Sequence, residues 1–271
     1  MKINISGIEL NYFIYGKGQP IVCIHGFGVD HRLMSGCLEP IFEKSAGYQR
    51  IYVDLPGMGQ STSKESLCAD EMIKILQAFL RQVIGTASYS LIGESYGGYL
   101  SLGLAKQETN RISGLYLLCP CTISRQTDRI LPVRKIPIVS EKIEVSVAQT
   151  NDYHDFLQVA TIATKATWQS YQKDILPGIK QADQAFLNRY QANGYSFSCE
   201  KELEAFSLDA PVTIITGKQD DVVGYVDAFR FMKQFSRASF LVVDDAGHNL
   251  QIEQPMIFQH SFNAWLEKIT E

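Results

Sequence analysis

The sequence predicts an α/β protein with a mostly parallel central sheet that helices cover on both faces. Short apolar runs such as "IVCI", "YSLI" and "PVTIITG" alternate along the chain with stretches whose apolar residues recur at helical spacing. The runs are apolar at consecutive positions, which is typical of strands buried on both sides of a parallel sheet. With 271 residues, 45% of them hydrophobic, the chain is long enough for one such domain with an insertion.

The first part of the chain begins this alternation. Residues 2–5 and 10–15 predict two strands joined by the turn-like "SGIE", and therefore a hairpin. "IVCIHGFG" predicts a strand that ends in glycines, followed by a helix near residues 33–44. "RIYVDLPGMGQS" predicts the next strand and its loop, and a helix with one buried face follows at residues 70–83. "YSLIGESYGGYLSLGLAKQ" predicts a strand, a sharp turn and a helix, and "ISGLYLLCP" predicts a further buried strand.

The alternation stops between residues 121 and 200. We expect no strand there, because "DYHDFLQVATIATKATW" and "QADQAFLNRYQA" are typical of helices, and prolines interrupt the segment. The alternation resumes at Pro211 with "PVTIITG", a helix near residues 225–234, the strand "SFLVVDDAG" and a final helix at residues 253–268. One sheet interrupted by a helical insertion follows from this order.

The amino-acid composition indicates which kinds of partner the protein binds. The formal net charge is −4, and no block of Lys or Arg occurs, which argues against a nucleic-acid or anionic membrane surface. The N-terminal segment lacks the apolar region of a secretory signal, and no apolar run approaches the roughly 20 residues that span a bilayer. We therefore expect a cytoplasmic protein with a small-molecule partner, no membrane association and an oligomeric state that the sequence leaves open.

The six cysteines do not indicate a metal or redox site. Most lie in apolar or scattered contexts, which suits buried free thiols in a reducing compartment. Cys119 and Cys121 in "LLCPCT" have one residue between them, and no second cluster completes a zinc site. We interpret this pair as core packing.

Ser95 is the candidate nucleophile. Gly93, Ser95 and Gly97 form a G-x-S-x-G pattern, which is short but lies directly between a predicted strand and a predicted helix. In such a turn the serine takes a strained backbone conformation, and a side chain at either glycine would collide with the neighbouring strand and helix. The alternative is a Gly-Ser turn that only caps a helix, and the strand-turn-helix context favours the nucleophile.

A base and an orienting acid follow in the later loops. His248 lies after the last predicted strand and, with an unperturbed pKa of roughly 6.5, is ready to accept a proton at neutral pH. The preceding strand is followed by Asp220 and Asp221, of which we choose Asp220 by its offset from Gly217 to hold the imidazole tautomer. The remaining histidines, among them His31, His154 and His260, are interpreted as structural or solvated.

Backbone N–H groups complete the predicted site. One should come from Tyr96, directly after the nucleophile, and one from Phe27 in "HGFG". Each such donor lowers the barrier by about 3 kcal/mol. Gly26 and Gly28 let the backbone approach a substrate, and His25 orders this loop by hydrogen bonding.

Taken together, these segments resemble the α/β-hydrolase superfamily over nearly the whole chain. The resemblance rests on "HGFG", "DLPGMGQS", "GESYGG", "GKQDDVVG" and "DDAGHNLQIEQP", and on the order serine, aspartate, histidine. It implies the α/β-hydrolase fold, with core parts at residues 1–120 and 201–271 and a helical cap at residues 121–200, inserted after the sixth strand. It also supports Ser95, Asp220 and His248 as the triad, but a fold and a triad do not define the substrate.

Glu94 departs from the pattern, because many members of the superfamily have histidine beside the serine. The carboxylate either faces inward and raises the pKa of His248, or pairs with a cation at the protein surface. We favour the surface pairing.

The predicted function is a serine hydrolase, similar to carboxylesterases, that cleaves a small, largely apolar ester through an acyl-enzyme intermediate, without cofactor or metal. Trp168 and Tyr190 are the predicted aromatic walls of the substrate pocket, although most aromatic residues of the cap are expected to pack within it. A carbon–carbon bond hydrolase or a lyase with the same triad is one alternative. A small-molecule receptor or signalling protein on the same fold is the other.

Overall fold

The predicted sheet is present. The computed structural model describes residues 1–64, 66–134 and 136–270. Within these residues, eight strands form one sheet in the order β1-β2-β4-β3-β5-β6-β9-β10, in which β1 and β2 are antiparallel to their neighbours and the remaining pairs are parallel. The strands are β1 (Lys2–Ile5), β2 (Ile8–Tyr15), β3 (Gln19–Ile24), β4 (Tyr48–Val53), β5 (Tyr89–Glu94), β6 (Ile112–Leu118), β9 (Val212–Gly217) and β10 (Ala238–Val243).

Burial explains why the central strands are apolar at consecutive positions. Every residue of β5 and of β9 is buried, as are the last four residues of β3. Side chains of a strand alternate between the faces of a sheet, so such strands need cover on both faces. The predicted hairpin is confirmed: β1 and β2 pair antiparallel around Ser6 and Gly7, both of which have positive φ.

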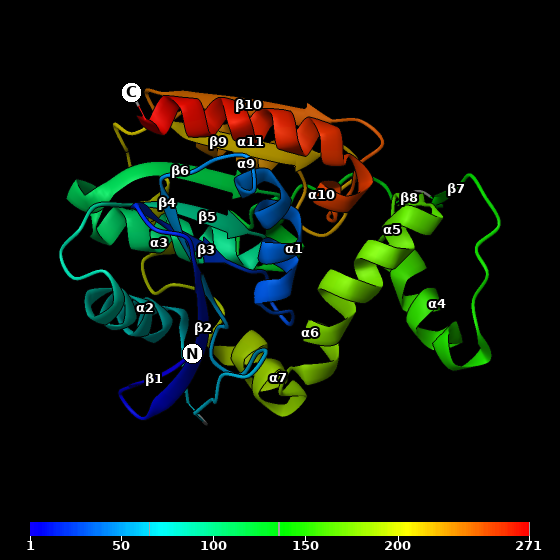
Figure 1. Ribbon diagram of the computed structural model, residues 1–271, viewed down its shortest axis with the longest axis horizontal. Helices are drawn as coiled ribbons and strands as arrows, with labels where there is room; N and C mark the ends of the chain where they lie inside the picture. The colour runs from blue at the N-terminus through cyan, green and yellow to red at the C-terminus, as the bar shows by residue number, and fades with distance from the viewer. Residues whose placement is uncertain (65, 135, 271) are drawn as a thin grey trace.

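Helices provide this cover. Helices α1 (His31–Phe42) and α11 (Pro255–Thr270) pack against each other, as do α2 (Ala69–Val83) and α3 (Tyr96–Gln107) (Figure 1). A further helix, α9 (Val226–Met232), packs against β9 and β10. The helix predicted at residues 33–44 begins two residues earlier, because the Asp30 side chain accepts a hydrogen bond from Arg32 N and caps it. The last helix is preceded by a separate short one, α10 (Leu250–Glu253).

The segment between β6 and β9 is mainly helical. We call residues 121–200 the insertion, and in Figure 1 its helices lie at the end of the sheet toward which the arrowhead of β10 points. This is the edge formed by the carboxyl ends of the strands, where ligands of open α/β sheets bind. Its helices are α4 (Thr150–Val159), α5 (Lys165–Ser170), the π-helix η4 (Tyr171–Ile175), α6 (Leu176–Gln181) and α7 (Gln184–Asn193), with α8 (Glu200–Leu203) at its end and the 3₁₀ turns η2 (Gln126–Asp128) and η3 (Val147–Gln149) before α4.

The prediction that the insertion contains no strand is wrong. Two short strands, β7 (Ile138–Val139) and β8 (Ile162–Ala163), pair in parallel, and β8 interrupts the helix predicted from "DYHDFLQVATIATKATW". The helix that follows has a local start: the Thr164 side chain accepts a hydrogen bond from Thr167 N, so a new helix begins at Lys165. Among the described residues, no helix combines the length and apolarity needed to cross a membrane.

Candidate active site

Ser95 lies in the sharp turn between β5 and α3. Its φ is 51°, a value rare for residues other than glycine, and its side chain is only 8% exposed. A Cβ on Gly93 would lie 2.4 Å from the carbonyl oxygen of Gly97, and a Cβ on Gly97 would lie 2.1 Å from the carbonyl oxygen of Ile24. The steric reason predicted for both glycines is therefore confirmed, and the strained turn raises Ser95 above the edge of the sheet.

Ser95, His248 and Asp220 form one hydrogen-bonded chain. The loop after β10 places His248 Nε2 at 2.9 Å from Ser95 Oγ, and the loop after β9 places Asp220 Oδ2 at 2.9 Å from His248 Nδ1. The other oxygen of Asp220 accepts hydrogen bonds from the backbone N–H groups of Val222 and Val223. Asp221, the alternative acid, points away and lies 3.6 Å from Arg134. Geometry therefore favours Asp220 over Asp221.

The ionised forms of Asp220 and His248 stabilise each other. Burial alone would raise the pKa of Asp220, but the charge and hydrogen bond of His248, with the two backbone donors, lower it. Burial alone would lower the pKa of His248, but the charge and hydrogen bond of Asp220, together with the charge of Glu94, raise it to about 9. Asp220 is thus ionised and stabilises the imidazolium that forms when His248 takes a proton.

Glu94 does not pair with a surface cation, and that expectation is wrong. The residue is the last of β5 and only 2% exposed, so its side chain is held inside the site. Its Oε1 lies 3.4 Å from His248 Nε2. Its Oε2 packs closely on the loop after β3, because a Cβ on Gly26 would lie 2.2 Å from this oxygen. Burial raises the pKa of Glu94 to about 7, with the charge of His248 opposing this shift and that of Asp220 adding to it. Carboxylates therefore face both nitrogens of the imidazole.

The candidate oxyanion donors are the backbone N–H groups of Phe27 and Tyr96. Tyr96 is the first residue of α3, so its N–H is one of the helix N-terminal donors without an intrahelical partner. In the described part of the chain, neither N–H has a hydrogen-bond acceptor within the protein. His25 orders the loop as predicted: Nδ1 donates to Gly26 O at 2.7 Å, and Nε2 accepts from Leu55 N at 3.0 Å. Burial lowers the pKa of His25, which suits this neutral, bridging form.

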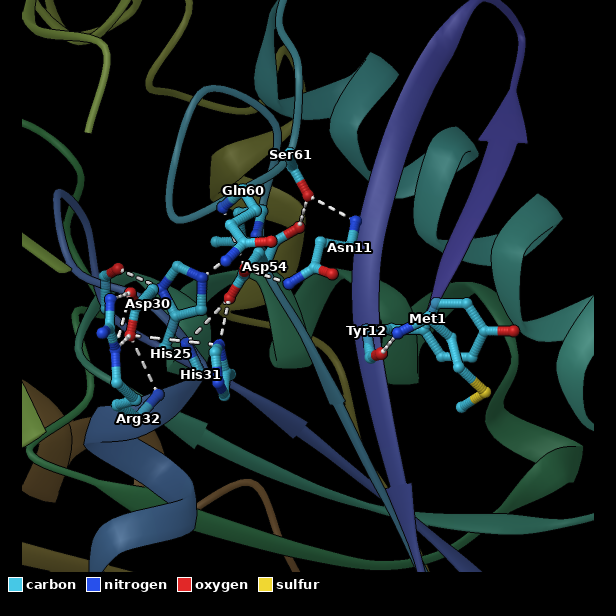
Figure 2. Close-up of polar contacts among 12 residues, drawn as sticks. Met1, Asn11, Tyr12, His25, Asp30, His31, Arg32, Asp54, Gln60 and Ser61 are labelled. Atoms are coloured by element: carbon cyan, nitrogen blue, oxygen red, sulfur yellow. Dashed lines mark hydrogen bonds and ion pairs between the residues drawn. The ribbon is translucent and has the colours of Figure 1, made fainter. Parts of the chain in front are cut away.

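A buried cluster of polar residues around Asp54 lies next to the loop that contains His25 (Figure 2). Asp54, directly after β4, accepts hydrogen bonds from Asn11 Nδ2, Gln60 N, and both the backbone N and the Nδ1 of His31. Burial alone would raise the pKa of Asp54, but the hydrogen bonds that His31 and Asn11 donate hold it well below its usual range. The cluster fixes the start of α1, and with it the end of the "HGFGVD" loop.

A pocket opens directly above Ser95 and has an empty volume of about 490 Å³, part of which is open to solvent. Its polar lining residues are Glu94, Ser95, His248 and Asn249. The rest of the lining is glycine or apolar and comprises Gly26, Phe27, Val29, Leu33, Val159, Tyr171, Ile175 and Ile179. Asn249 and the aliphatic residues were not predicted. Its position next to His248 could have identified Asn249 as a pocket residue. The aliphatic residues had no such signal, because in the sequence they look like ordinary core residues.

Three residues predicted to bind substrate do not line this pocket: Gly28, Trp168 and Tyr190. The two aromatic residues lie one layer behind it, because the ring of Trp168 packs within the insertion and that of Tyr190 packs between the insertion and the core. Trp168 is 3% exposed and stacks on Tyr171 at 5.9 Å between ring centroids. Tyr190 stacks on Phe27 at 6.1 Å, and its hydroxyl lies 2.6 Å from that of Tyr96. Both therefore support pocket residues instead of meeting a ligand.

Two groups of potential metal ligands occur among the described residues. Cys119 lies near Asp220 and His248, and Asp30 lies near His31 and Asp54, with the ligand atoms of each group within 4.8 Å of one another. In both groups the carboxylates already accept hydrogen bonds from protein donors. These contacts account for the clustering, and Cys119 and Cys121 are buried as predicted.

Known proteins share the fold of this chain. A model of the Alpha/beta hydrolase family matches residues 21–258. The chain belongs to the α/β-hydrolase family. An α/β superfamily hydrolase from Oenococcus oeni PSU-1 superposes with a TM-score of 0.93, with 30% identity and full coverage of both chains.

Two curated relatives of this α/β hydrolase are hydrolases by name. A 2-hydroxy-6-oxo-6-(2'-aminophenyl)hexa-2,4-dienoic acid hydrolase of Metapseudomonas resinovorans is 23% identical over 98% of this chain and 90% of its own length. A pimeloyl-[acyl-carrier protein] methyl ester esterase of Nitrosomonas europaea is 26% identical over 92% of this chain and 96% of its own. This α/β hydrolase is accordingly an enzyme that hydrolyses a small-molecule substrate.

Proposed function

We propose that this hydrolase cleaves small, largely apolar carboxylic esters, with Ser95 as nucleophile, His248 as base and Asp220 as the orienting acid. The observation that carries the proposal is the chain of two 2.9 Å hydrogen bonds from Ser95 Oγ through His248 to Asp220, at the floor of a mostly apolar pocket. The insertion serves as the cap of this pocket, since Val159, Tyr171 and Ile175 line it.

The reaction proceeds in two halves. Ser95 Oγ attacks the ester carbonyl carbon while His248 Nε2 takes its proton, and the N–H groups of Phe27 and Tyr96 bind the oxyanion. His248 then gives the proton to the leaving alcohol, which departs and leaves an acyl group on Ser95. Water, activated by His248, attacks this acyl-enzyme and releases the carboxylic acid, after which the serine recovers its proton.

Carbon–carbon bond hydrolysis is the second candidate, because one relative over nearly the full chain acts on a hexa-2,4-dienoic acid. The pocket itself favours the ester. Whenever Glu94 is ionised, its buried carboxylate opposes an anionic substrate close to Ser95, whereas a neutral ester has no such cost. A dienoic acid has a carboxylate of its own, and among the described residues that line the pocket there is no Lys or Arg to receive it.

The test combines a covalent probe with a substrate panel. A fluorophosphonate should label Ser95 of the wild type and leave Ser95→Ala unlabelled. Short p-nitrophenyl esters should turn over many times, with activity falling for long acyl chains, while thioesters and dienoate ketones are compared in the same panel. Labelling at another residue contradicts the assignment of the nucleophile. Hydrolysis of dienoate ketones in preference to all esters contradicts the assignment of the substrate class, and ligand binding without turnover would indicate a receptor.

A further inference from the structure

Glu253, the last residue of α10, joins two parts of the molecule that are distant in the sequence. Its Oε2 accepts a hydrogen bond from Gly247 N at 2.6 Å, in the loop that carries His248. Its Oε1 accepts from Thr161 N at 2.6 Å and from Ile162 N at 3.3 Å, in the insertion. One carboxylate therefore holds the loop of the proposed base with one oxygen and the insertion with the other.

The two parts that Glu253 joins are in direct contact. A Cβ on Gly247 would lie 2.4 Å from Thr161 Oγ1, so the loop needs glycine there to let the insertion approach. Thr161 O in turn accepts a hydrogen bond from Ile138 N at 2.8 Å, which attaches the pair of short strands β7 and β8 to the same point. A shift of the insertion at Thr161 is thereby transmitted to the residue next to His248.

The carboxylate of Glu253 is buried without a cationic partner among the described residues. The residue is 7% exposed, and none of the described Lys, Arg or His side chains lies within 4 Å of its oxygens. Its charge is compensated by the three backbone N–H groups alone, and burial raises its pKa despite these donors. A buried carboxylate without a cation is costly to fold, so its retention calls for a role that an apolar side chain does not fulfil.

We propose that Glu253 is a positioning residue, which holds His248 in register with Ser95 by making the base loop and the insertion one mechanical unit. The inference rests on the proposed function, because it assigns a consequence for His248 as base. It differs from the role of Asp220, which contacts the imidazole itself, since Glu253 acts only through the backbone of Gly247.

Glu253→Gln is the informative variant. Glutamine keeps the size of the side chain but has one acceptor oxygen, so its NH₂ faces an N–H donor at one of the two ends and that contact is lost. A displacement of the base of the order of 1 Å costs up to about a hundredfold in rate. We expect the rate at which a fluorophosphonate labels Ser95 to fall by about tenfold to a hundredfold. For an ester substrate, kcat should fall with KM almost unchanged.

Glu200 provides the matched control. Its carboxylate also accepts a backbone hydrogen bond across the base of the insertion, from Ser124 N at 2.7 Å, with a second one from Ser124 Oγ at 3.0 Å. Unlike Glu253, it has no contact with the described residues of the His248 loop. Glu200→Gln should therefore remove the charge at this contact of the insertion but leave the labelling rate of Ser95 near that of the wild type.

The outcomes separate the inference from the proposed function. Absence of labelling and of ester hydrolysis in the wild type would contradict the proposed function. Normal labelling in the wild type, with equal losses in Glu253→Gln and Glu200→Gln or with no loss in either, would contradict the positioning role. Hydrogen exchange on the wild type keeps the test valid if Glu253→Gln does not fold. The amides of Gly247, Thr161 and Ile162 should open together with one protection factor, and independent exchange at the two ends would overturn the proposal.

Discussion

Replacing Glu94 by glutamine should move the pH–rate profile of the enzyme toward acid. Glu94 Oε1 lies 3.4 Å from His248 Nε2, and both side chains are largely shielded from water, 2% and 16% exposed. Two unit charges at that distance attract each other by about 1 kcal/mol at the dielectric constant of water and by about 5 kcal/mol at the effective value of about 20 used for protein sites. Since about 1.4 kcal/mol corresponds to one pH unit, the loss of the charge is worth about one to three and a half pH units.

The sign follows from which form Glu94 favours. An ionised Glu94 stabilises the imidazolium and so raises the pKa of His248, which with Asp220 reaches about 9. Burial raises the pKa of Glu94 to about 7, so this carboxylate is ionised over most of the range in which His248 titrates. Glutamine removes the charge, lowers the pKa of His248 and makes the basic imidazole available at lower pH. The acidic limb of kcat/KM should move from near pH 9 to about pH 8 or below.

The assay is kcat/KM for a short p-nitrophenyl ester, corrected for spontaneous hydrolysis, together with the rate of fluorophosphonate labelling over the same pH range. Labelling reports on Ser95 and His248 without depending on which ester fits the pocket. Asp221→Asn is the matched control, because this carboxylate pairs with Arg134 and does not contact His248. An acidic limb that stays in place in Glu94→Gln, or moves to higher pH, would refute the electrostatic argument.

Two further predictions concern buried carboxylates. Asp220→Asn should lower kcat by about 10⁴-fold, because Asp220 holds the tautomer of His248. Asp221→Asn should remain close to wild type. Ester kinetics measure both variants, and a larger loss in Asp221→Asn would show that Asp221 is the orienting acid. Asp54→Ala should cost about 3–5 kcal/mol of unfolding free energy at pH 7 in urea titrations, since it removes the acceptor of the buried donors around His31. Because the pKa of Asp54 is lowered on folding, its contribution is present above pH 4 and fades as the pH falls further, so the difference between the proteins should shrink in acid.

The sequence was sufficient for the fold because local and global signals agree there. Runs buried on both faces, such as β5 and β9, are apolar at most positions, and the turn at Ser95, with its positive φ, needs the glycines that flank it. The insertion was predicted less well. The break at Ala160 and the strand β8 depend on Glu253, about 90 residues further along the chain, which captures the N–H groups of Thr161 and Ile162. No local pattern contains that information.

The orientation of Glu94 shows the same limit at the site. A carboxylate beside an exposed serine is ordinarily solvated, and the sequence offers no reason to bury it. The structure supplies the reason: β5 delivers the side chain between the Gly26 backbone and the imidazole, in a space that a Cβ on Gly26 would fill. The residues that line the pocket were equally difficult to predict from the sequence. Trp168 and Tyr190 look like ligand-binding aromatics in the sequence, yet each stacks behind a residue that does line the pocket.

Three buried carboxylates thus surround one histidine, and each acts on a different property of it. Asp220 contacts Nδ1 and selects the tautomer, Glu94 faces Nε2 and biases the charge, and Glu253 holds the preceding backbone N–H and sets the position. The amide variants of the three residues should therefore fail in three distinguishable ways. A large loss of rate together with a displaced acidic limb marks the tautomer, because Asp220 also makes the largest contribution to the raised pKa of His248. A displaced limb without a large loss of rate marks the charge, and a lower rate with an unmoved limb marks the position. If any two variants gave the same profile, the division of labour among these carboxylates would be wrong, even with all three in contact with the histidine or its loop.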